Sequence, residues 1–403
     1  MSRAVAADAR RQGRVALPWL ALLAGPLSFG ITAPALVLGD IAAALGTTAG
    51  TAATLVTAFG WGIAVGSPLA GRVIARLGVR RALAVSSALV VAGALLVLAS
   101  AALPAVVLVV AGCALQALGS VGLTVTAVGL AAGPVAMGTV SGALASFGAV
   151  APLVGTQVAA ALGWRVALVL PLLSLLAVPA ALRGAQPPVA GGPRDPLGVT
   201  LLVLAVSALA LLTALPAAGA TVAAAVAAGA GIWLARHARR HPGGIVPASV
   251  PRSGRFLLAC ATAFGLAVVN FAIIYATPPV LAATTGWGAD QLGSALLGPY
   301  LAGGLLALVL VPVTAGLRYP VLTLMLVATS LAAALLAATG GAPAPLFTAM
   351  LLGSVAAATG QGALGLRAGA AVPPPDREPA LSLFTLCYLL GAAFGPAIAV
   401  AVG

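Results

Sequence analysis

The chain has 403 residues, of which 62% are hydrophobic and only 6% are charged, and its formal net charge is +13. Soluble domains typically carry about 25% charged residues, so this composition excludes a soluble globular protein. The basic residues are all Arg. Fifty Gly and twenty-nine Pro in so apolar a chain are typical of membrane helices, in which small residues permit close helix contacts and Pro is tolerated.

Long apolar runs follow one another along the whole sequence. A helix needs about 20 apolar residues to cross the hydrocarbon core of a bilayer. The sequence therefore predicts an all-α polytopic membrane protein with about 13 transmembrane spans. The spans are expected near residues 16–38, 49–71, 82–102, 105–131, 135–161, 165–182, 197–215, 218–235, 256–282, 291–314, 320–339, 344–366 and 380–402.

The Arg residues lie almost entirely in alternate loops. With the N-terminus in the cytoplasm, Arg165 is the one Arg of the nineteen that falls outside. Basic loops stay cytoplasmic, so this asymmetry predicts a multi-pass protein of the inner (plasma) membrane with a cytoplasmic N-terminus. It also accounts for the positive charge without a nucleic-acid partner, and it makes the lipid bilayer the expected partner of these side chains.

Small residues and Pro recur at corresponding places in the two halves of the chain. Such elements occur in span five and in span thirteen, and a Pro shortly before a Gly also ends spans two and ten. The candidate helix-packing residues are Ala151, Pro152, Gly155, Gly391, Gly395 and Pro396. Many secondary transporters are built from internal repeats, with the substrate site near the midplane between them.

The segment that follows span two carries a family resemblance. From Gly71 to Arg81 it resembles the Gly-x-x-x-Asp-Arg-x-Gly-Arg-Arg loop of the major facilitator superfamily. Gly71, Arg76, Gly78 and Arg80 match, whereas Ala75 replaces the Asp. The resemblance implies a loop that gates the cytoplasmic side. The alternative is a basic turn that only fixes topology.

The domain organisation follows from the same resemblance. Span five resembles the antiporter motif Gly-x-x-x-Gly-Pro-x-x-Gly-Gly. The spans at 197–215 and 218–235, opened by Asp195, resemble the two extra helices of fourteen-span drug:proton antiporters. A major-facilitator-type two-bundle fold with two inserted helices is implied. Its parts are a basic arm (1–15), an N-terminal six-helix bundle (16–183), a linker with two extra transmembrane helices (184–255), and a C-terminal bundle without its last helix (256–403).

Acidic residues are scarce in the expected spans. All six map to loops or span ends, and Cys113 stands where the family's intramembrane Arg would be. An ionisable group inside a membrane is a functional-site hypothesis by default. Asp40, at the outer end of span one, is the best remaining candidate for a proton site, and its alternative interpretation is a solvated loop acid.

Neutral polar residues lie within the spans that resemble the family's cavity-lining helices. They face the bundle interior because hydrocarbon leaves their hydrogen bonds unmade. The candidate substrate-cavity residues are Gln116, Asn270, Tyr275, Gln361 and Tyr388. The alternative is that they only join helices to one another. A cavity without fixed charge favours a neutral or weakly charged, largely apolar solute.

The leading hypothesis is a monomeric secondary active transporter that exports lipophilic small molecules or drugs by alternating access, with protons as a candidate second substrate. The alternatives are an uncoupled facilitator or metabolite exporter, and a degenerate non-transporting membrane protein. No enzyme motif, cofactor or metal site is expected. His237 and His241 are four residues apart without a Cys or carboxylate in sequence beside them, so a basic loop is the better interpretation than a metal site.

Overall fold

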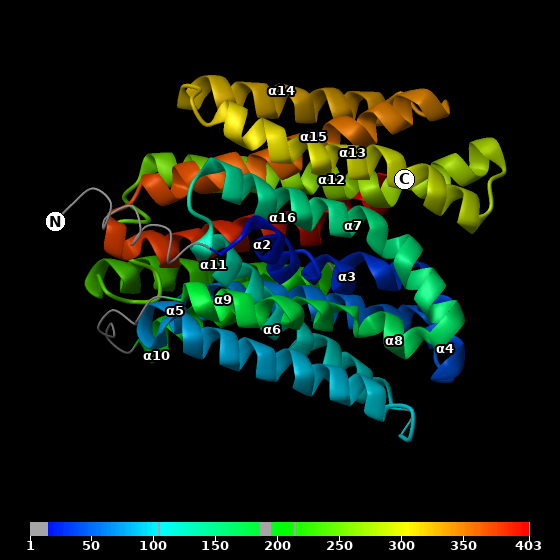
Figure 1. Ribbon diagram of the computed structural model, residues 1–403, viewed down its shortest axis with the longest axis horizontal. Helices are drawn as coiled ribbons and strands as arrows, with labels where there is room; N and C mark the ends of the chain where they lie inside the picture. The colour runs from blue at the N-terminus through cyan, green and yellow to red at the C-terminus, as the bar shows by residue number, and fades with distance from the viewer. Residues whose placement is uncertain (1–14, 104, 186–194, 213–214, 216, 403) are drawn as a thin grey trace.

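The computed structural model describes residues 15–103, 105–185, 195–212, 215 and 217–402. Every regular element in this part of the chain is a helix, which confirms the expected all-α class. The long helices lie side by side along the longest axis of the molecule (Figure 1). Nine helices among the described residues are long and apolar enough to cross a membrane.

The first predicted span is broken. Helix α2 (Leu17–Ala24) is followed by α3 (Leu27–Thr32), the 3₁₀ helix η1 (Ala33–Leu36) and α4 (Leu38–Ala44). Pro26 precedes α3 and Pro34 lies in the first turn of η1. Proline lacks the amide hydrogen that a continuous helix needs. The predicted span at 16–38 is therefore helical but irregular, with Leu17–Thr32 as its apolar helical stretch.

Spans two and three form one long element, α5 (Ala49–Ala99), which turns back on itself at a single residue. Gly78 has φ 80° and ψ 164°, a conformation that side chains with a Cβ disfavour. The predicted loop between residues 71 and 82 is therefore helical on both sides of Gly78. The spans run to Leu77 and restart at Val79, beyond the boundaries expected from hydropathy.

The rest of the first half comprises two regular helices and one irregular span. The elements are α6 (Val106–Leu130), α7 (Pro134–Leu162), α8 (Trp164–Leu168), η2 (Leu170–Ala177) and α9 (Val178–Gly184). The predicted span 165–182 is thus divided among α8, η2 and α9, with Pro171 and Pro179 at the starts of the second and third.

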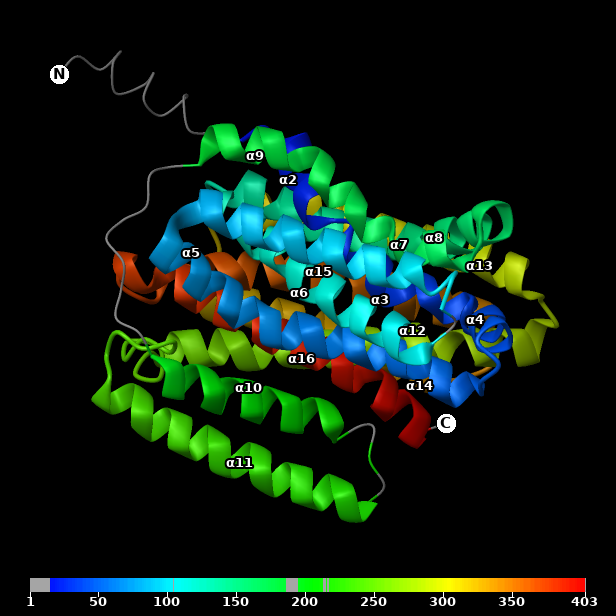
Figure 2. The same ribbon diagram turned by 90° about the horizontal axis from the view of Figure 1, so that it is seen from below.

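The second half begins with a helical hairpin formed by α10 (Pro196–Leu211) and α11 (Ala217–Arg240). Figure 2 shows α10 beside the main body and α11 outside it. The remaining elements are α12 (Gly254–Thr285), α13 (Ala289–Thr314), α14 (Tyr319–Ala338), α15 (Pro343–Ala370), η3 (Pro374–Asp376) and α16 (Arg377–Val402).

Two pairs of helices join the first-half group, α2–α9, to the second-half group, α12–α16. Helix α5 packs along α16, and α7 packs along α13, while α10 rests on α5. We call these two contacts the α5–α16 seam and the α7–α13 seam. One apolar cluster, with Leu55 and Ile63, lies in the first-half group. A second cluster, with Leu266 and Leu364, lies mainly in the second-half group and extends onto α5 and α10.

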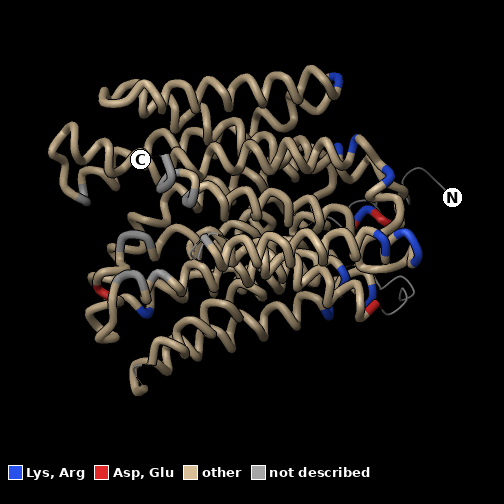
Figure 3. The backbone as a smooth tube through the Cα atoms, turned by 180° about the vertical axis from the view of Figure 1, so that it is seen from behind, with Lys and Arg blue, Asp and Glu red and all other residues tan. Residues whose placement is uncertain are grey.

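Charged residues are concentrated at one end of the helices (Figure 3). This end, called the basic end below, holds the turn of α5 at Gly78, the C-terminus of α11 and the N-terminus of α16. The Arg-rich segments that the sequence assigned to one side of the membrane are therefore gathered together in space.

Candidate functional site

The α5–α16 seam is tightly closed near the basic end. Ser67 Oγ donates a hydrogen bond of 2.8 Å to the carbonyl oxygen of Ser382, and both side chains are buried. A Cβ placed on Gly71 would overlap the side chain of Ser382. Because Gly71 has no side chain, α5 and α16 approach closely at this point. The two halves of the molecule are therefore in contact at the basic end.

Glu378 lies where α5, α6 and α16 converge. A Cβ built on Gly129, at the end of α6, would lie 3.2 Å from Glu378 Oε1, and one built on Gly71 would lie 3.6 Å from the Glu378 carbonyl oxygen. The Glu378 side chain is half-buried and makes no hydrogen bond or ion pair within the described chain. From the sequence this carboxylate was expected to be an ordinary span-end residue.

The other residues of the predicted gating segment differ in exposure. Arg76 is half-buried, and its Nε atom has no hydrogen-bond partner among the described residues. Gly78 forms the turn, and Arg80 is exposed. Gly71 is the residue of this segment that packs directly against the opposite half of the molecule.

The α7–α13 seam is made by small residues. A Cβ on Gly142 would lie 2.8 Å from the carbonyl oxygen of Gly304, and one on Gly304 would lie 2.7 Å from Ser146 Oγ. Gly138 faces Leu308 and Pro312 at 3.3 Å in the same way. Farther from the basic end, at Gly293 and Gly298 of α13, no described atom lies within 4 Å of the position that a Cβ would take. The glycine-mediated contacts of this seam among the described residues therefore lie from Gly138 to Ser146 on α7.

The candidate helix-packing residues lie within each half. Ala151 is fully buried, and a Cβ built on Gly155 would lie 2.8 Å from the Ala33 Cβ of η1. Gly391 packs against Phe264, and Gly395 against Phe271, both on α12. The fifth span thus contacts the first span of the first-half group, and α16 contacts α12, the first helix of its own second-half group. Pro152 lies inside α7, and Pro396 lies inside α16 with its side chain outside the described part.

A row of polar groups crosses the α7–α13 seam in the middle of the helices. Ser146 of α7 faces Gly304, and the carbonyl oxygen of Tyr300 accepts a 3.3 Å hydrogen bond from Ser354 of α15. Next along α15, a Cβ on Gly353 would lie 3.3 Å from Oδ1 of Asn270. We call Ser146, Asn270, Tyr300 and Ser354 the mid-helix polar row.

Three atoms of the mid-helix polar row are buried without a partner among the described residues. They are Ser146 Oγ, Asn270 Oδ1 and the hydroxyl of Tyr300. Buried polar atoms normally make hydrogen bonds, and unpaired ones cost free energy. These groups are therefore candidates for hydrogen bonds with a polar atom of a bound solute. Asn270 was predicted from the sequence, whereas Ser146 and Tyr300 were not, because neither position differs from ordinary helical Ser and Tyr in sequence.

The other four predicted cavity residues lie elsewhere. Gln116 is fully buried beside Gly93 of α5, inside the first-half group, and both its amide atoms lack partners among the described residues. Gln361 lines a small gap between α7, α15 and α16 near the basic end. Tyr388 is buried in the second-half apolar cluster, and Tyr275 is half-buried on α12. The five residues are thus not brought together at one place.

Asp40 lies in the first turn of α4, and it is exposed. An acidic residue there is favourable to the helix dipole. The exposure of Asp40 is compatible with a proton site and with a solvated loop acid, so both roles stay predictions.

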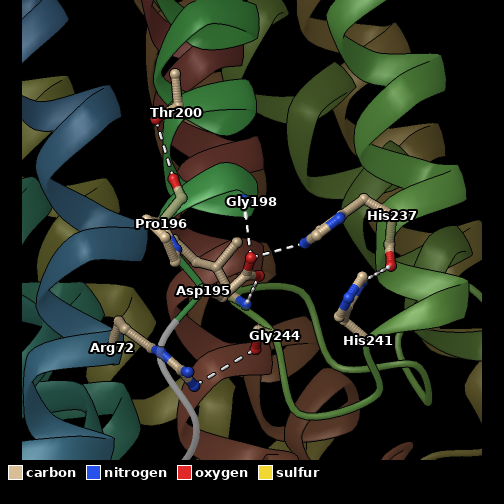
Figure 4. Close-up of polar contacts among 9 residues, drawn as sticks. Arg72, Asp195, Pro196, Gly198, Thr200, His237, His241 and Gly244 are labelled. Atoms are coloured by element: carbon tan, nitrogen blue, oxygen red, sulfur yellow. Dashed lines mark hydrogen bonds and ion pairs between the residues drawn. The ribbon is translucent and has the colours of Figure 1, made fainter.

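A polar cluster that the sequence did not reveal lies at the basic end of the hairpin (Figure 4). Asp195 caps α10 by accepting a 2.8 Å hydrogen bond from the Gly198 amide, and its other oxygen accepts one of 2.9 Å from the Ile245 amide. His237 Nε2 lies 2.6 Å from Asp195 Oδ1. Burial acts to raise the pKa of Asp195, but the hydrogen bonds from Ile245, Gly198 and His237 bring that pKa below its usual value.

His237 and His241 belong to this cluster and not to a basic loop. His237 lies inside α11 and is buried, and the His241 ring stacks on it with centroids 4.1 Å apart. The expectation of a loop over 236–240 is therefore wrong, since α11 continues to Arg240. The described residues contain no group of three or more His, Cys, Asp or Glu side chains that could hold a metal ion.

The segment 241–253 that follows α11 contacts both halves at the basic end. Arg72 of α5 donates to the carbonyl oxygen of Gly244 at 3.4 Å. Ser249 donates a 2.6 Å hydrogen bond to Asp376, and Ser253 donates one of 3.2 Å to the carbonyl oxygen of Ala371. This segment therefore bridges the two halves at the end where both seams are closed.

The chain forms two helical groups joined by α5–α16 and α7–α13, with the hairpin between them in sequence. Comparison with solved structures shows that this fold is of the major facilitator type. The human organic anion transporter MFSD10 (TETRAN) matches with a TM-score of 0.65 and 16% identity over 97% of this chain and 93% of that chain. The proton:xylose symporter XylE, solved with 6-bromo-6-deoxy-D-glucose, matches with a TM-score of 0.60 and 14% identity over 94% and 87%.

The POT family transporter PepTSo is also similar, with a TM-score of 0.57 and 18% identity over 96% of this chain and 89% of that chain. No protein-family model matches the sequence, and no curated protein matches it. At these identities the likeness shows the fold, and it leaves the drug:proton antiporter subgroup as a prediction.

Proposed function

We propose that this protein is a secondary transporter that works by alternating access. The observation that carries the proposal is the mid-helix polar row, which lies on the seam between the two halves with three polar atoms unpaired within the described chain. A solute bound there would contact both halves at once. Rocking of the halves about this site would then expose it to each side in turn.

The closed contacts at the basic end support an outward-facing state, provided that the basic end is cytoplasmic as the Arg distribution predicts. The glycines at the basic half of each seam leave no room for side chains. Opening toward the cytoplasm would therefore require the Ser67–Ser382 hydrogen bond to break and segment 241–253 to release one half.

The proposed substrates are lipophilic small molecules or drugs, moved outward. The polar row offers a hydroxyl, a phenol and an amide but no charged group, which suits a largely apolar solute with one or two hydrogen-bonding atoms. Hydrogen bonds to such a solute would satisfy groups that otherwise remain unpaired.

An uncoupled facilitator is the second candidate, because the polar row contains no carboxylate that could carry a proton. If transport is proton-coupled, the candidates are Asp40, as the sequence indicated, and Glu378. Glu378 would gain water when the basic end opens, since it is half-buried between α6 and α16 in the closed arrangement.

Transport in proteoliposomes tests these proposals. A panel of lipophilic solutes is loaded with and without an imposed pH gradient, and wild type is compared with Asn270→Ala and with Thr348→Ala, an exposed α15 position, as the matched control. We expect Asn270→Ala to lower uptake at least about fivefold, as the loss of a buried hydrogen bond predicts, and Thr348→Ala to leave it unchanged. Movement of no solute by wild type would favour the degenerate alternative.

The same preparation separates the coupling mechanisms. Gradient-driven transport that survives Asp40→Asn and disappears in Glu378→Gln would assign coupling to Glu378, and the reverse would assign it to Asp40. Equal uptake with and without the gradient would establish a facilitator. Reporters fused after Arg240 and at Trp287 should report cytoplasmic and external locations, and the opposite result would overturn the orientation.

A further inference from the structure

The inserted hairpin carries a groove that the transport proposal does not use. It has a volume of about 610 Å³ and is formed mainly by one face of α11, with Leu197 of α10 opposite. Its apolar part consists of Gly229, Ile232 and Trp233, and its polar part consists of Arg236, Arg240 and the two His side chains. The apolar part lies toward the middle of α11, and the polar part lies at the basic end.

The two Arg residues of this groove are available for binding. Arg236 and Arg240 are one helical turn apart on the same face, and both are exposed. Neither makes a hydrogen bond or ion pair within the part of the chain that the structure describes. The nearest acid in the cluster, Asp195, has a side chain that is only 7% exposed and is already engaged by His237 and two backbone amides. The exposed charge of the groove is therefore positive.

The apolar part of the groove is open to the surroundings of the helix. Ile232 is 56% exposed and Trp233 is 58% exposed. At Gly229 no described atom lies within 4 Å of the position that a Cβ would take, so the helix has a notch beside Trp233. Trp is favoured at the depth of lipid headgroups, and Arg binds phosphate with its planar guanidinium. The groove thus places an apolar notch next to two guanidinium groups. A phospholipid has the complementary arrangement, with an apolar acyl chain next to a phosphate.

We propose that this groove binds an anionic phospholipid. The phosphate and headgroup lie between Arg236 and Arg240, and one acyl chain lies along Ile232 and Trp233 in the notch at Gly229. The lipid thereby covers the outer face of α11, the helix with the smallest buried share among the candidate membrane spans. Because His237 on the same helix turn is held by Asp195, the bound lipid also rests against the cluster that ties the hairpin to segment 241–253.

Native mass spectrometry of the full chain in neutral detergent, titrated with dioleoyl phosphatidylglycerol or dioleoyl phosphatidylcholine, tests the proposal. Each surface Arg contributes about a fivefold change in affinity for an anionic membrane surface, so Arg236→Gln with Arg240→Gln should weaken phosphatidylglycerol binding about 30-fold. The matched control is Arg252→Gln with Arg255→Gln, which removes the same charge from exposed positions outside the groove. It should retain the bound lipid.

Further experiments distinguish a phospholipid from a free phosphate compound as the bound anion. Glycerol phosphate, which has the headgroup without acyl chains, should not displace the lipid, and Ile232→Ser with Trp233→Ser should weaken binding although both Arg remain. Thermal unfolding in phosphatidylcholine establishes that each variant is folded. Equal loss of phosphatidylglycerol in the groove and control variants, or equal binding of both lipids to wild type, would overturn the proposal. So would the appearance of a dimer mass that the Ile232→Ser, Trp233→Ser variant abolishes, because a second copy would then occupy the groove.

Discussion

Asp195 holds the basic end of the hairpin through three contacts, so its removal should loosen α10, α11 and segment 241–253 together. Asp195→Ala removes the cap on Gly198, the bond to Ile245 and the contact with His237. A cap contributes about 1 kcal/mol, and a hydrogen bond to a charged group about 1.5–3 kcal/mol. Since the contacts share one side chain, we expect a total loss of about 3 kcal/mol.

The variant Asp195→Asn separates the cap from the charge. Asparagine caps a helix as well as aspartate does, so the Gly198 contact should persist. The bond to Ile245 becomes uncharged, and the contact with His237 loses the negative charge of the carboxylate. The expected loss is about 1.5 kcal/mol, roughly half that of the Ala variant.

The pH dependence has a definite sign. The pKa of Asp195 is lower in the folded protein than its usual value. Its contribution is therefore fully present above the ordinary carboxyl pKa of about 4, and it is lost as the pH falls through the lowered folded-state value. Wild type and Asp195→Asn should therefore differ at pH 6, and the difference should shrink as the pH falls through the lowered folded-state pKa of Asp195.

Amide hydrogen exchange measures the loss locally. Exchange of the Ile245 amide and of the last turn of α11 should accelerate in the order wild type, Asp195→Asn, Asp195→Ala, whereas exchange far from the cluster should not change. Exchange in α4, at the opposite end of the molecule (Figure 2), serves as the distant reference. Identical protection of Ile245 in all three proteins at pH 6 would refute the structural role assigned to Asp195.

Three further predictions concern the seams. Gly142→Leu should prevent close approach of α7 to Gly304, so transport should fall. Alkylation of a Ser67→Cys variant by an impermeant maleimide should increase at the same time, and unchanged labelling would contradict the closed seam. Gly78→Ala should lower the free energy of unfolding by about 1–3 kcal/mol, because φ 80° with ψ 164° is a conformation essentially restricted to Gly. An unchanged unfolding temperature would contradict this turn geometry. Glu378→Gln should reduce the same labelling, because a neutral side chain costs less to bury; increased labelling would show that the carboxylate favours closure.

Hydropathy and charge were sufficient to predict most of the membrane helices. Long runs such as 256–282 and 344–366 became α12 and α15 with longer ends, because a helix in hydrocarbon must satisfy its own backbone and therefore needs no neighbour to define it. The irregular first span was not foreseen, although Pro26 and Pro34 were visible, since hydropathy averages over the breaks they cause.

The sequence by itself determined the composition of the membrane spans, the asymmetry of Arg and the positions of small residues, because each depends on one residue and its local neighbours. Which residues contact one another was decided only by the tertiary structure. Asp195 and His237 are 42 residues apart, and Ser67 and Ser382 are 315 apart. Ser146 and Tyr300 likewise became site candidates only when α7 and α13 were placed together. Pairing of such distant groups is set by how helices pack against one another, which the period of a single helix does not encode.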